Sequence, residues 1–451
     1  MSKIKSLLPI ITVLSIASCS PSGGGVSSIQ QGGSSSSNSS LPGSSSFVAH
    51  SFEGILLNNP QKAFNRNDTV ASKSTYVESL NSLSKDLYKN IFDGGNKIYS
   101  TISIANCFSM LLEGAKENSK KELEDFLHYD DSFNHLDEIK NSLLRNAIND
   151  GGNETYLDIS QSFWVDDSFR DDIKQAYINT LENYYYAEAF SGELKSDRMH
   201  QALADYINDK THNFLNVKKE DFDNYAGVLW LLNTIYLKSQ WMNSFYESAN
   251  IDDVFANLNG TEKTVTYMRK EEDSCYLASD NYALASIPLQ HGLKFNILLP
   301  NKDGNYEAIL SSDEALNALH DFPTYMKQAS RQAIQFQIPQ FRVQESIDLP
   351  KLLKEKMGVT EIFDKNLANL TDIATLKPDE NLYVSNAKHE AGLEIKNQGL
   401  EAAAYTVIEV EYATAITPPV IPTKFIVDHP FAYSITNIDG IPLFTGVTTI
   451  L

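Results

Sequence analysis

Residues 399–412 read Gly-Leu-Glu-Ala-Ala-Ala-Tyr-Thr-Val-Ile-Glu-Val-Glu-Tyr, and their alternation decides how the chain is interpreted. With a period of two, every charge of this stretch, on Glu401, Glu409 and Glu411, falls on one side. The alanines also allow a helix, but three β-branched residues follow one another at 406–408, and a helical period scatters the glutamates around the axis. The pattern therefore favours a strand with one charged face.

The next stretch, residues 414–423, contains Pro418, Pro419 and Pro422 and is typical of a loop. A strand-like segment that leads straight into a loop has no obvious neighbour along the chain. We therefore expect residues 399–412 to form a strand that leads into an exposed connection and that need not be paired from the outset.

Composition indicates a globular protein. The 451 residues are 42% hydrophobic and 10% aromatic, which excludes disorder, collagen and coiled coil as descriptions of the whole chain. The formal net charge of −21, without a basic patch, argues against a nucleic-acid partner. Three cysteines, Cys19, Cys107 and Cys275, are too few for a disulfide framework and form no CxxC pair for zinc.

Local patterns predict both helices and strands. Ser119 to Glu122 has the form of a capping box that opens an amphipathic helix, and a second helix is expected from Leu349 to Met357, ending at Gly358. Strands are expected at 228–232, 293–299 and 334–338. Helices crowd the first half and strands the second, without a repeat. This arrangement favours an α+β fold over a doubly wound sheet or a barrel.

The sequence carries no familiar catalytic apparatus. It contains no GxSxG, GxxxxGK[ST], GxGxxG or HExxH motif. His389 and Glu390 are adjacent, but neighbouring residues of a strand point to opposite faces and cannot act as an acid/base pair. Two aspartate pairs, at 166–167 and 171–172, are interpreted as solvated surface. We therefore expect no metal, no cofactor and no enzymatic activity.

The amino terminus has the layout of an export signal. Lys3 and Lys5 precede an apolar run, and Ile16-Ala17-Ser18-Cys19 resembles a bacterial lipobox. The resemblance implies that residues 1–18 are a signal peptide and that Cys19 is lipidated and anchors the chain to a membrane. Residues 19–50, rich in Ser and Gly, are expected to be a flexible tether, and residues 51–451 the folded domain. Ser20 favours the outer membrane, facing the periplasm or the exterior; the alternative is a plain secretory signal.

Several motifs, spread in order over most of the chain, resemble those of the serpins, the suicide inhibitors of serine and sometimes cysteine proteases. The hinge upstream of the serpin reactive-centre loop is similar to Gly399, Leu400, Glu401, Ala402, Ala403 and Ala404. The other similar segments are Asn96 to Ser103, residues 113–127, residues 184–190, Asn233 with Lys238, Trp241 and Phe245, Pro339 with Phe341, Gly358 with Thr360 and Phe363, residues 429–431 and residues 443–446.

The resemblance implies a fold and a mechanism. The fold has three β-sheets, about eight or nine helices and an exposed reactive-centre loop, and the protein is expected to act as a monomer. A target protease attacks the loop and forms its acyl-enzyme, and the freed loop inserts into the main sheet as a new antiparallel strand. The energy for this step would be stored as strand pairing that the native state leaves unmade.

The resemblance also assigns residues. Family spacing places the scissile bond at Ala413-Thr414, which suits an elastase-like protease, or alternatively at Tyr412-Ala413, which suits a chymotrypsin-like one. Ser103, Asn233 and His389 align with a polar cluster beneath the opening sheet. Trp241 aligns with the tryptophan at which the loop first enters the sheet.

Some residues depart from the pattern of inhibitory members. Asn397 replaces Glu, Leu400 replaces Thr or Ser, Tyr405 replaces a small residue, and Asn213 replaces Gly. We expect Leu400 to face inward and to be accommodated. Two other functions remain open: a non-inhibitory serpin that acts as a surface binding or decoy protein, and an outer-membrane lipoprotein that binds glycans or peptides.

Overall fold

The computed structural model describes residues 9–19, 55–58, 75–149, 155–223, 227–302, 304–400 and 421–451. The α-helices in these ranges are α1 (Thr75–Ile91), α2 (Thr101–Leu112), α3 (Glu117–Leu127), α4 (His135–Arg145), α5 (Gln175–Tyr185), α6 (Asp197–Lys210), α7 (Tyr306–Leu310), α8 (Asp313–His320), α9 (Phe322–Met326) and α10 (Leu349–Lys356).

The strands are β1 (Pro9–Cys19), β2 (Ile55–Asn58), β3 (Lys97–Tyr99), β4 (Ile148–Asn149), β5 (Tyr156–Asp166), β6 (Glu188–Gly192), β7 (Leu229–Gln240), β8 (Ile251–Ala256), β9 (Glu262–Ala278), β10 (Tyr282–Pro288), β11 (Lys294–Pro300), β12 (Ser330–Pro339), β13 (Phe341–Asp348), β14 (Asn381–Lys396), β15 (Gly399–Leu400), β16 (Thr423–Ile426), β17 (Phe431–Thr436) and β18 (Pro442–Thr448).

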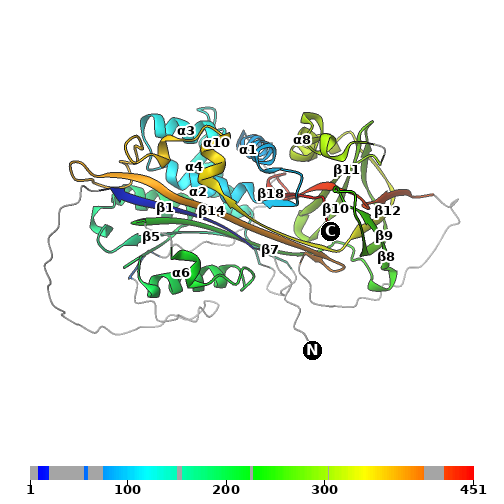
Figure 1. Cartoon of the computed structure of the whole chain (residues 1–451), viewed down its shortest axis with the longest axis horizontal. Helices are drawn as coiled ribbons and strands as arrows, with labels where there is room; N and C mark the ends of the chain where they lie inside the picture. Colours follow the sequence, from blue (N-terminus) through cyan, green and yellow to red (C-terminus); the bar gives the residue numbers. More distant parts are fainter. Residues whose placement is uncertain are drawn as a thin grey trace.

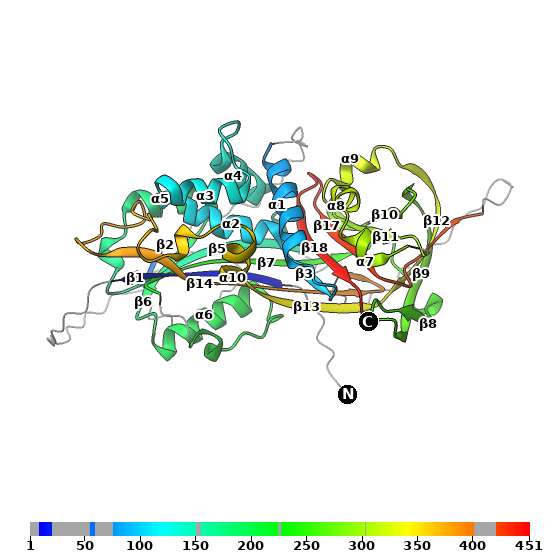
Figure 2. The same ribbon diagram turned by 45° about the horizontal axis from the view of Figure 1, so that its top comes forward.

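These strands form two sheets of nine strands each. The first has the order β1-β14-β15-β7-β5-β6-β2, with β13 on β14 and β4 on β5. The second has the order β16-β12-β9-β10-β11-β17-β18-β3, with β8 on β9. Most helices cover one face of the first sheet, and α6 lies on its opposite face (Figures 1 and 2).

The first sheet is buried on both faces, and its central strands are correspondingly apolar. Nine consecutive residues of β7, from Leu229 to Leu237, are buried. α2 packs against one side of this strand, and all of its residues are buried. On the other side, α6 covers a separate apolar cluster that includes Trp164 and Trp230. A strand covered on both faces reads as a continuous apolar run rather than as an alternation.

The α+β class and the expected strands are confirmed. Residues 228–232, 293–299 and 334–338 fall in β7, β11 and β12, except that Val228 and Leu293 each precede their strand by one residue. Strands β7 and β12 are longer than expected, and the helix expected before Gly358 is α10. The described ranges hold ten α-helices, two of them only five residues long. The three sheets expected join into two because β9, which is 17 residues long, pairs with β8, β10 and β12.

The capping box expected at Ser119 to Glu122 is wrong. Helix α3 begins at Glu117, after the N-cap residue Lys116. The side chains of Ser119 and Glu122 instead form hydrogen bonds with residues that are far away in the sequence. The Ser119 hydroxyl donates to the Glu361 carboxylate at 3.2 Å, and the Glu122 carboxylate accepts from the backbone N–H of Thr360 at 2.9 Å.

The amino-terminal strand β1 lies inside the first sheet, between β14 and β7. In Figure 1 it is the dark blue strand beside β14. Its residues belong to the segment expected to be a signal peptide ending before Cys19, and the cleavage itself stays a prediction. Among the described residues, no helix is both long enough and apolar enough to cross a membrane.

Candidate functional site

The candidate site is the position between β7 and β14, where two short segments are paired on both sides. At one end lies β15, antiparallel to both strands, with Leu400 opposite Ile395 of β14 and Ser239 of β7. Over the rest of the length lies β1, also antiparallel to both. The expectation that this position is left unpaired is therefore wrong. The reason lies in the composition of residues 10–16, which are mostly β-branched or apolar and suit a buried strand.

The backbone of Gly399 fits only glycine. Its φ of +142° lies in a region that other residues rarely adopt. A Cβ atom at this position would lie 2.2 Å from the carbonyl oxygen of Ser239 and 2.6 Å from the Cα of Gln240. Glycine therefore lets β15 approach β7 closely at the point where the chain turns out of β14.

Leu400 is fully buried between the two strands, and the expectation that it is accommodated on the inward face is confirmed. Its neighbours Ile395 and Ser239 are buried as well. Burying a leucine side chain contributes about 1.5–3 kcal/mol. The first two residues of the hinge are thus seated in the sheet.

Trp241 fastens the end of β14 to the end of β7. Its indole Nε1–H donates to the carbonyl of Lys396 at 2.9 Å, and its backbone N–H donates to the carbonyl of Gln398 at 3.1 Å. The ring is 1% exposed and packs edge-on against Phe245 and Phe295. Trp241, which aligns with the tryptophan at the point of loop insertion in serpins, therefore contacts the residues just before Gly399 directly.

Asn397 is the centre of a neutral hydrogen-bond network. Its side-chain oxygen accepts from the amides of Asn250 at 3.0 Å and Gln340 at 2.5 Å, and its Nδ2 donates to the carbonyl of Phe245 at 3.2 Å. The residue is 2% exposed. A buried glutamate would need a cation here, whereas an asparagine needs only these amide and carbonyl partners. The hydrogen bonds around Asn397 therefore compensate for the absence of the glutamate that inhibitory members have here.

A buried lysine lies beside the same end of the sheet. The Lys270 ammonium donates to the carbonyl of Asn243 at 2.8 Å and lies 4.6 Å from the centre of the Phe245 ring. Burial lowers the pKa of Lys270, while the neighbouring Glu272 carboxylate opposes this shift. Sequence reasoning missed this group, because a lysine and a glutamate two residues apart on a strand give no signal of burial.

The expected polar cluster is only partly assembled. His389 is fully buried, and its Nε2 accepts from the backbone N–H of Ser100 at 3.1 Å. Burial lowers the pKa of His389 to about 3, so the ring is neutral and can accept this bond. The backbone N–H of Ser103 donates to the Ser100 hydroxyl at 3.3 Å. Ser100 thus links two of the predicted residues, although only its place in the Asn96–Ser103 motif hinted at this.

Asn233 is not joined to this cluster. Asn233 and His389 lie opposite the same residue of β1, Thr12, one on each side. One strand therefore separates them, and neighbouring strands lie about 4.8 Å apart. The Asn233 side chain is fully buried, and within the described ranges both of its polar atoms lack a hydrogen-bond partner. The three aligned residues are therefore not brought together while β1 occupies this position.

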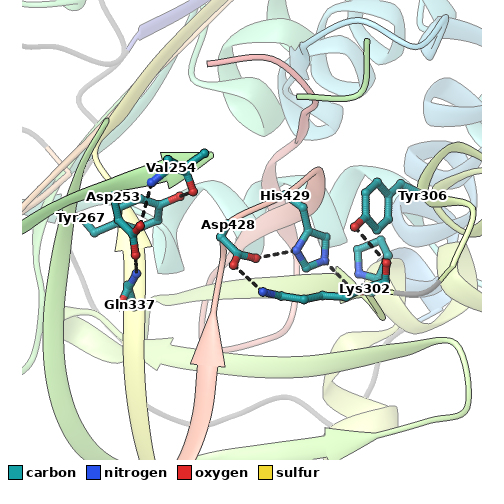
Figure 3. A network of polar contacts seen from close by, with 9 residues as sticks. Asp253, Val254, Tyr267, Lys302, Tyr306, Gln337, Asp428 and His429 are labelled. Atoms are coloured by element: carbon teal, nitrogen blue, oxygen red, sulfur yellow. Dashed lines mark hydrogen bonds and ion pairs between the residues drawn. The ribbon is translucent and has the colours of Figure 1, made fainter. Parts of the chain in front are cut away.

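A polar network holds the chain on the far side of the loop, just after β16 (Figure 3). The Asp428 carboxylate accepts from Lys302 Nζ at 2.6 Å and lies 2.7 Å from His429 Nδ1, and His429 Nε2 lies 2.7 Å from the carbonyl oxygen of Pro300. Tyr306 stacks on the imidazole. Burial opposes ionisation of Asp428, but the hydrogen bonds from His429 and Lys302 outweigh it and lower the pKa of the carboxyl.

This aspartate-histidine pair is not a catalytic base. A general base needs a free nitrogen that faces the substrate, whereas His429 Nε2 faces a backbone carbonyl and the residue is 2% exposed. The pair instead ties residues 428–429 to the end of β11. It fastens the segment that follows the loop.

Glu401, Ala402, Ala403, Ala404, Tyr405, Tyr412, Ala413 and Thr414 lie outside the described residues, and Cys19 is the last residue of β1. Asn213 has a φ of +59°, which explains why glycine would also suit this position. Cys107 is buried, as expected of a core residue, and burial raises the pKa of its thiol. In the described part of the chain, no group of three or more His, Cys, Asp or Glu side chains could hold a metal.

The sequence and the structure were compared with known proteins. Residues 78–449 match the family model described as Serpin (serine protease inhibitor). Neuroserpin from Mus musculus is 27% identical over 403 residues, which cover 84% of this chain and 92% of the relative.

Solved structures give the same picture of the fold. The native state of tengpin, a thermophilic serpin, superposes with a TM-score of 0.70 at 19% identity, covering 88% of this chain and all of tengpin. Human thyroxine-binding globulin in complex with its ligand has a TM-score of 0.69 at 20% identity, covering 84% of this chain and 98% of that one. The fold therefore occurs both in a protein named as a serpin and in a protein named for binding thyroxine.

Proposed function

Because the chain belongs to the serpin family, we propose that it is a suicide inhibitor that traps a serine protease by inserting its cleaved loop between β7 and β14. One observation carries this proposal: the hinge is already paired with both strands at Gly399 and Leu400. Further pairing would continue in the same register, away from Trp241, once β1 no longer occupies the position.

The covalent step uses the protease's own chemistry. The catalytic serine oxygen attacks the carbonyl carbon of Ala413, the bond to the nitrogen of Thr414 breaks, and that nitrogen leaves as an amine after taking a proton from the protease histidine. An ester then joins the protease to Ala413. Insertion of residues 401–413 before water attacks this ester would carry the protease away and distort its active site.

The driving force is strand pairing and burial. Apolar loop residues at alternate positions, Ile408 and Val410, would contribute about 1.5–3 kcal/mol each if buried as Leu400 is. A ladder of backbone hydrogen bonds adds roughly 0.5–1.5 kcal/mol apiece. The total is on the order of 10 kcal/mol, which is comparable to the stability of a whole domain.

Target choice follows from the residue at the scissile bond. The small side chain of Ala413 would favour an elastase-like protease, and cleavage after Tyr412 instead would favour a chymotrypsin-like one. Mass spectrometry of the carboxy-terminal fragment that a panel of proteases releases distinguishes the two bonds. A fragment beginning at Thr414 supports the first assignment, and one beginning at Ala413 supports the second.

The experiment that tests inhibition mixes the chain lacking residues 1–18 with an elastase-like protease and looks for a complex that survives boiling in SDS. The matched control is Ala403→Pro, because proline cannot donate to the strand ladder and should stop insertion while leaving the scissile bond intact. The proposal is supported if the unaltered chain forms the complex and the Ala403→Pro variant is only cleaved. Cleavage of both without complex would reject it.

A second candidate is a non-inhibitory serpin that binds a ligand or acts as a decoy. The observation that favours it is β1, since a chain whose insertion position is filled cannot insert its loop. Human thyroxine-binding globulin, named for what it binds, has the same fold. This candidate predicts cleavage without complex and little stabilisation.

We further propose that the protein is exported and anchored by lipid at Cys19, at the outer membrane. The support is the sequence Ile16-Ala17-Ser18-Cys19 and the Ser/Gly-rich segment that follows it. Metabolic labelling with a radioactive fatty acid tests this: the label should enter the protein and be lost in Cys19→Ala. A secreted, unlabelled protein would contradict the anchor.

A further inference from the structure

The segments β1 and β15 lie one after the other in the same position and run in the same direction. Both are antiparallel to β7 and to β14. β15 ends opposite Ser239 and Ile395, and β1 begins opposite Tyr236. The amino-terminal strand therefore starts a few residues beyond the point where the hinge stops.

The two segments also share one register. Leu400 lies opposite Ser239 on β7 and Ile395 on β14, so each further loop residue would move one position back along both strands. Four residues on, Ala404 would lie opposite Ile235 and Ala391. These are the two residues that lie opposite Ile10.

The correspondence holds along the strand as far as Ser15, after which the register on β14 shifts. Thr12 takes the place of Thr406, and Leu14 takes the place of Ile408. Leu14 is fully buried and belongs to the main apolar core. The loop and β1 therefore compete for the same hydrogen bonds and for the same buried side-chain position.

We propose that the amino-terminal segment Pro9–Cys19, while attached to the chain, plugs the position that the loop enters, so that its removal makes insertion possible. The effect on protease inhibition rests on the function proposed above. The claim that β1 fills the position between β7 and β14 does not depend on that function. Cleavage before Cys19 would remove all of β1 except its last residue. The uncleaved chain is then inactive as an inhibitor, and processing activates it.

The plugged state carries a cost that makes it reversible. With β1 in place, the buried Asn233 amide has no partner within the described ranges, and one strand separates it from His389. An unsatisfied buried polar group destabilises the state that contains it. Because β1 leaves this amide without a hydrogen-bond partner, β1 is bound less tightly than its pairing with two strands alone would imply.

The test uses the whole chain, produced with Cys19→Ser so that the leader is retained, and compares it with the same chain carrying Leu14→Asp. A carboxylate at a fully buried position should expel β1. Hydrogen exchange of the β7 and β14 amides between 229–236 and 384–391 should then accelerate by at least about tenfold. Leu14→Ile is the matched control and should leave exchange unchanged. Equal exchange in Leu14→Asp and the parent chain would overturn the proposal.

A second measurement decides the matter if Leu14→Asp fails to fold. Ile16→Cys with Leu229→Cys joins two residues that lie opposite each other, whereas Ile16→Cys with Ile235→Cys joins residues that lie six positions out of register. A disulfide within one chain in the first pair alone supports the plug. No disulfide in the first pair, or one that links two chains, would contradict it.

The rate of SDS-stable complex formation separates this proposal from the proposed function. The Leu14→Asp chain should react at least about tenfold faster than the plugged parent. If neither forms complex but exchange accelerates, the plug stands and the inhibitor assignment falls. If both form complex equally fast and exchange is equal, the plug falls and the inhibitor assignment stands.

Discussion

The two strands on either side of the proposed reactive loop, β15 and β16, are held in different ways. The hinge, β15, lies in the middle of a sheet and is hydrogen-bonded on both sides. The far end, β16, lies at the edge of the other sheet, pairs with β12 alone among the described strands, and is followed by the charged network of Asp428 and His429. The first end lies between β7 and β14, and the second does not. If the loop inserts as proposed, this difference predicts that the strand grows inward from the hinge while β16 keeps its place.

The largest expected effect is at the hinge itself. Leu400→Asp would bury a carboxylate between β7 and β14, at a cost of several kcal/mol. We expect the variant to be cleaved by the protease without forming an SDS-stable complex. Leu400→Thr, which restores a residue common in inhibitory members, is the control and should keep complex formation. Unimpaired trapping by Leu400→Asp would mean that this residue is not part of the inserted strand.

A somewhat smaller effect is expected at the glycine before it. Gly399→Ala would place a Cβ atom 2.2 Å from a backbone oxygen at a positive φ, and we expect a loss of roughly 3 kcal/mol or expulsion of β15. Gly358→Ala is a matched control, because its φ is also positive but nothing lies within 4 Å of the added atom. The control should cost only about 1 kcal/mol. Urea unfolding of both variants measures the difference, and equal costs would contradict the tight fit.

The histidine beneath the insertion position should make the protein acid-sensitive. The pKa of His389 is about 3 in the fold and about 6.5 when unfolded, so the unfolded chain takes up the proton first as the pH falls below 6.5. The free energy of unfolding should therefore drop between pH 6.5 and 3, by about 2 kcal/mol from this residue at pH 5.

His389→Gln should flatten part of that slope, since glutamine can accept from Ser100 but does not titrate. Urea unfolding at pH 7 and pH 5 gives the slope for each protein. The buried His320, whose pKa is also lowered to about 3, is retained and keeps part of the acid sensitivity. An unchanged slope in the variant would show that His389 is not the titrating group.

The smallest effect is expected at the far end of the loop. Asp428→Asn removes one charge from the network of Figure 3 and should cost about 1 kcal/mol, because Lys302 is mostly exposed and its ion pair contributes little. The loss should leave complex formation intact, since β16 is not part of the inserted strand. Asp131→Asn, the same change at an exposed turn between α3 and α4, is the control. A large loss of inhibition in Asp428→Asn would contradict the division of roles between the two ends.

The features that could be predicted from the sequence were those set by local pattern or by family motifs. The α+β class, α10, the strands β7, β11 and β12, and the inward position of Leu400 all follow from periodicity, capping and the hinge motif. The start of α3 did not, because Ser119 and Glu122 bind residues far along the chain. A capping motif does not show whether a tertiary partner takes its side chains.

The rest of the site depends on contacts that no local pattern encodes. The Asn397 network joins three segments, and Ser100 links residues from a helix start and a distant strand. The position of β1 could not be predicted for a different reason, because an apolar run of this length suits a signal peptide as well as a buried strand. Only the register on both neighbouring strands shows which loop residues it replaces.

The most direct test of the central claim is the melting temperature before and after the loop is cut, measured on the chain lacking residues 1–18. If the cut loop takes the place between β7 and β14, pairing worth on the order of 10 kcal/mol should raise the melting temperature by more than about 10 °C. An unchanged melting temperature after complete cleavage would contradict the account, because the position would then not be where the loop goes.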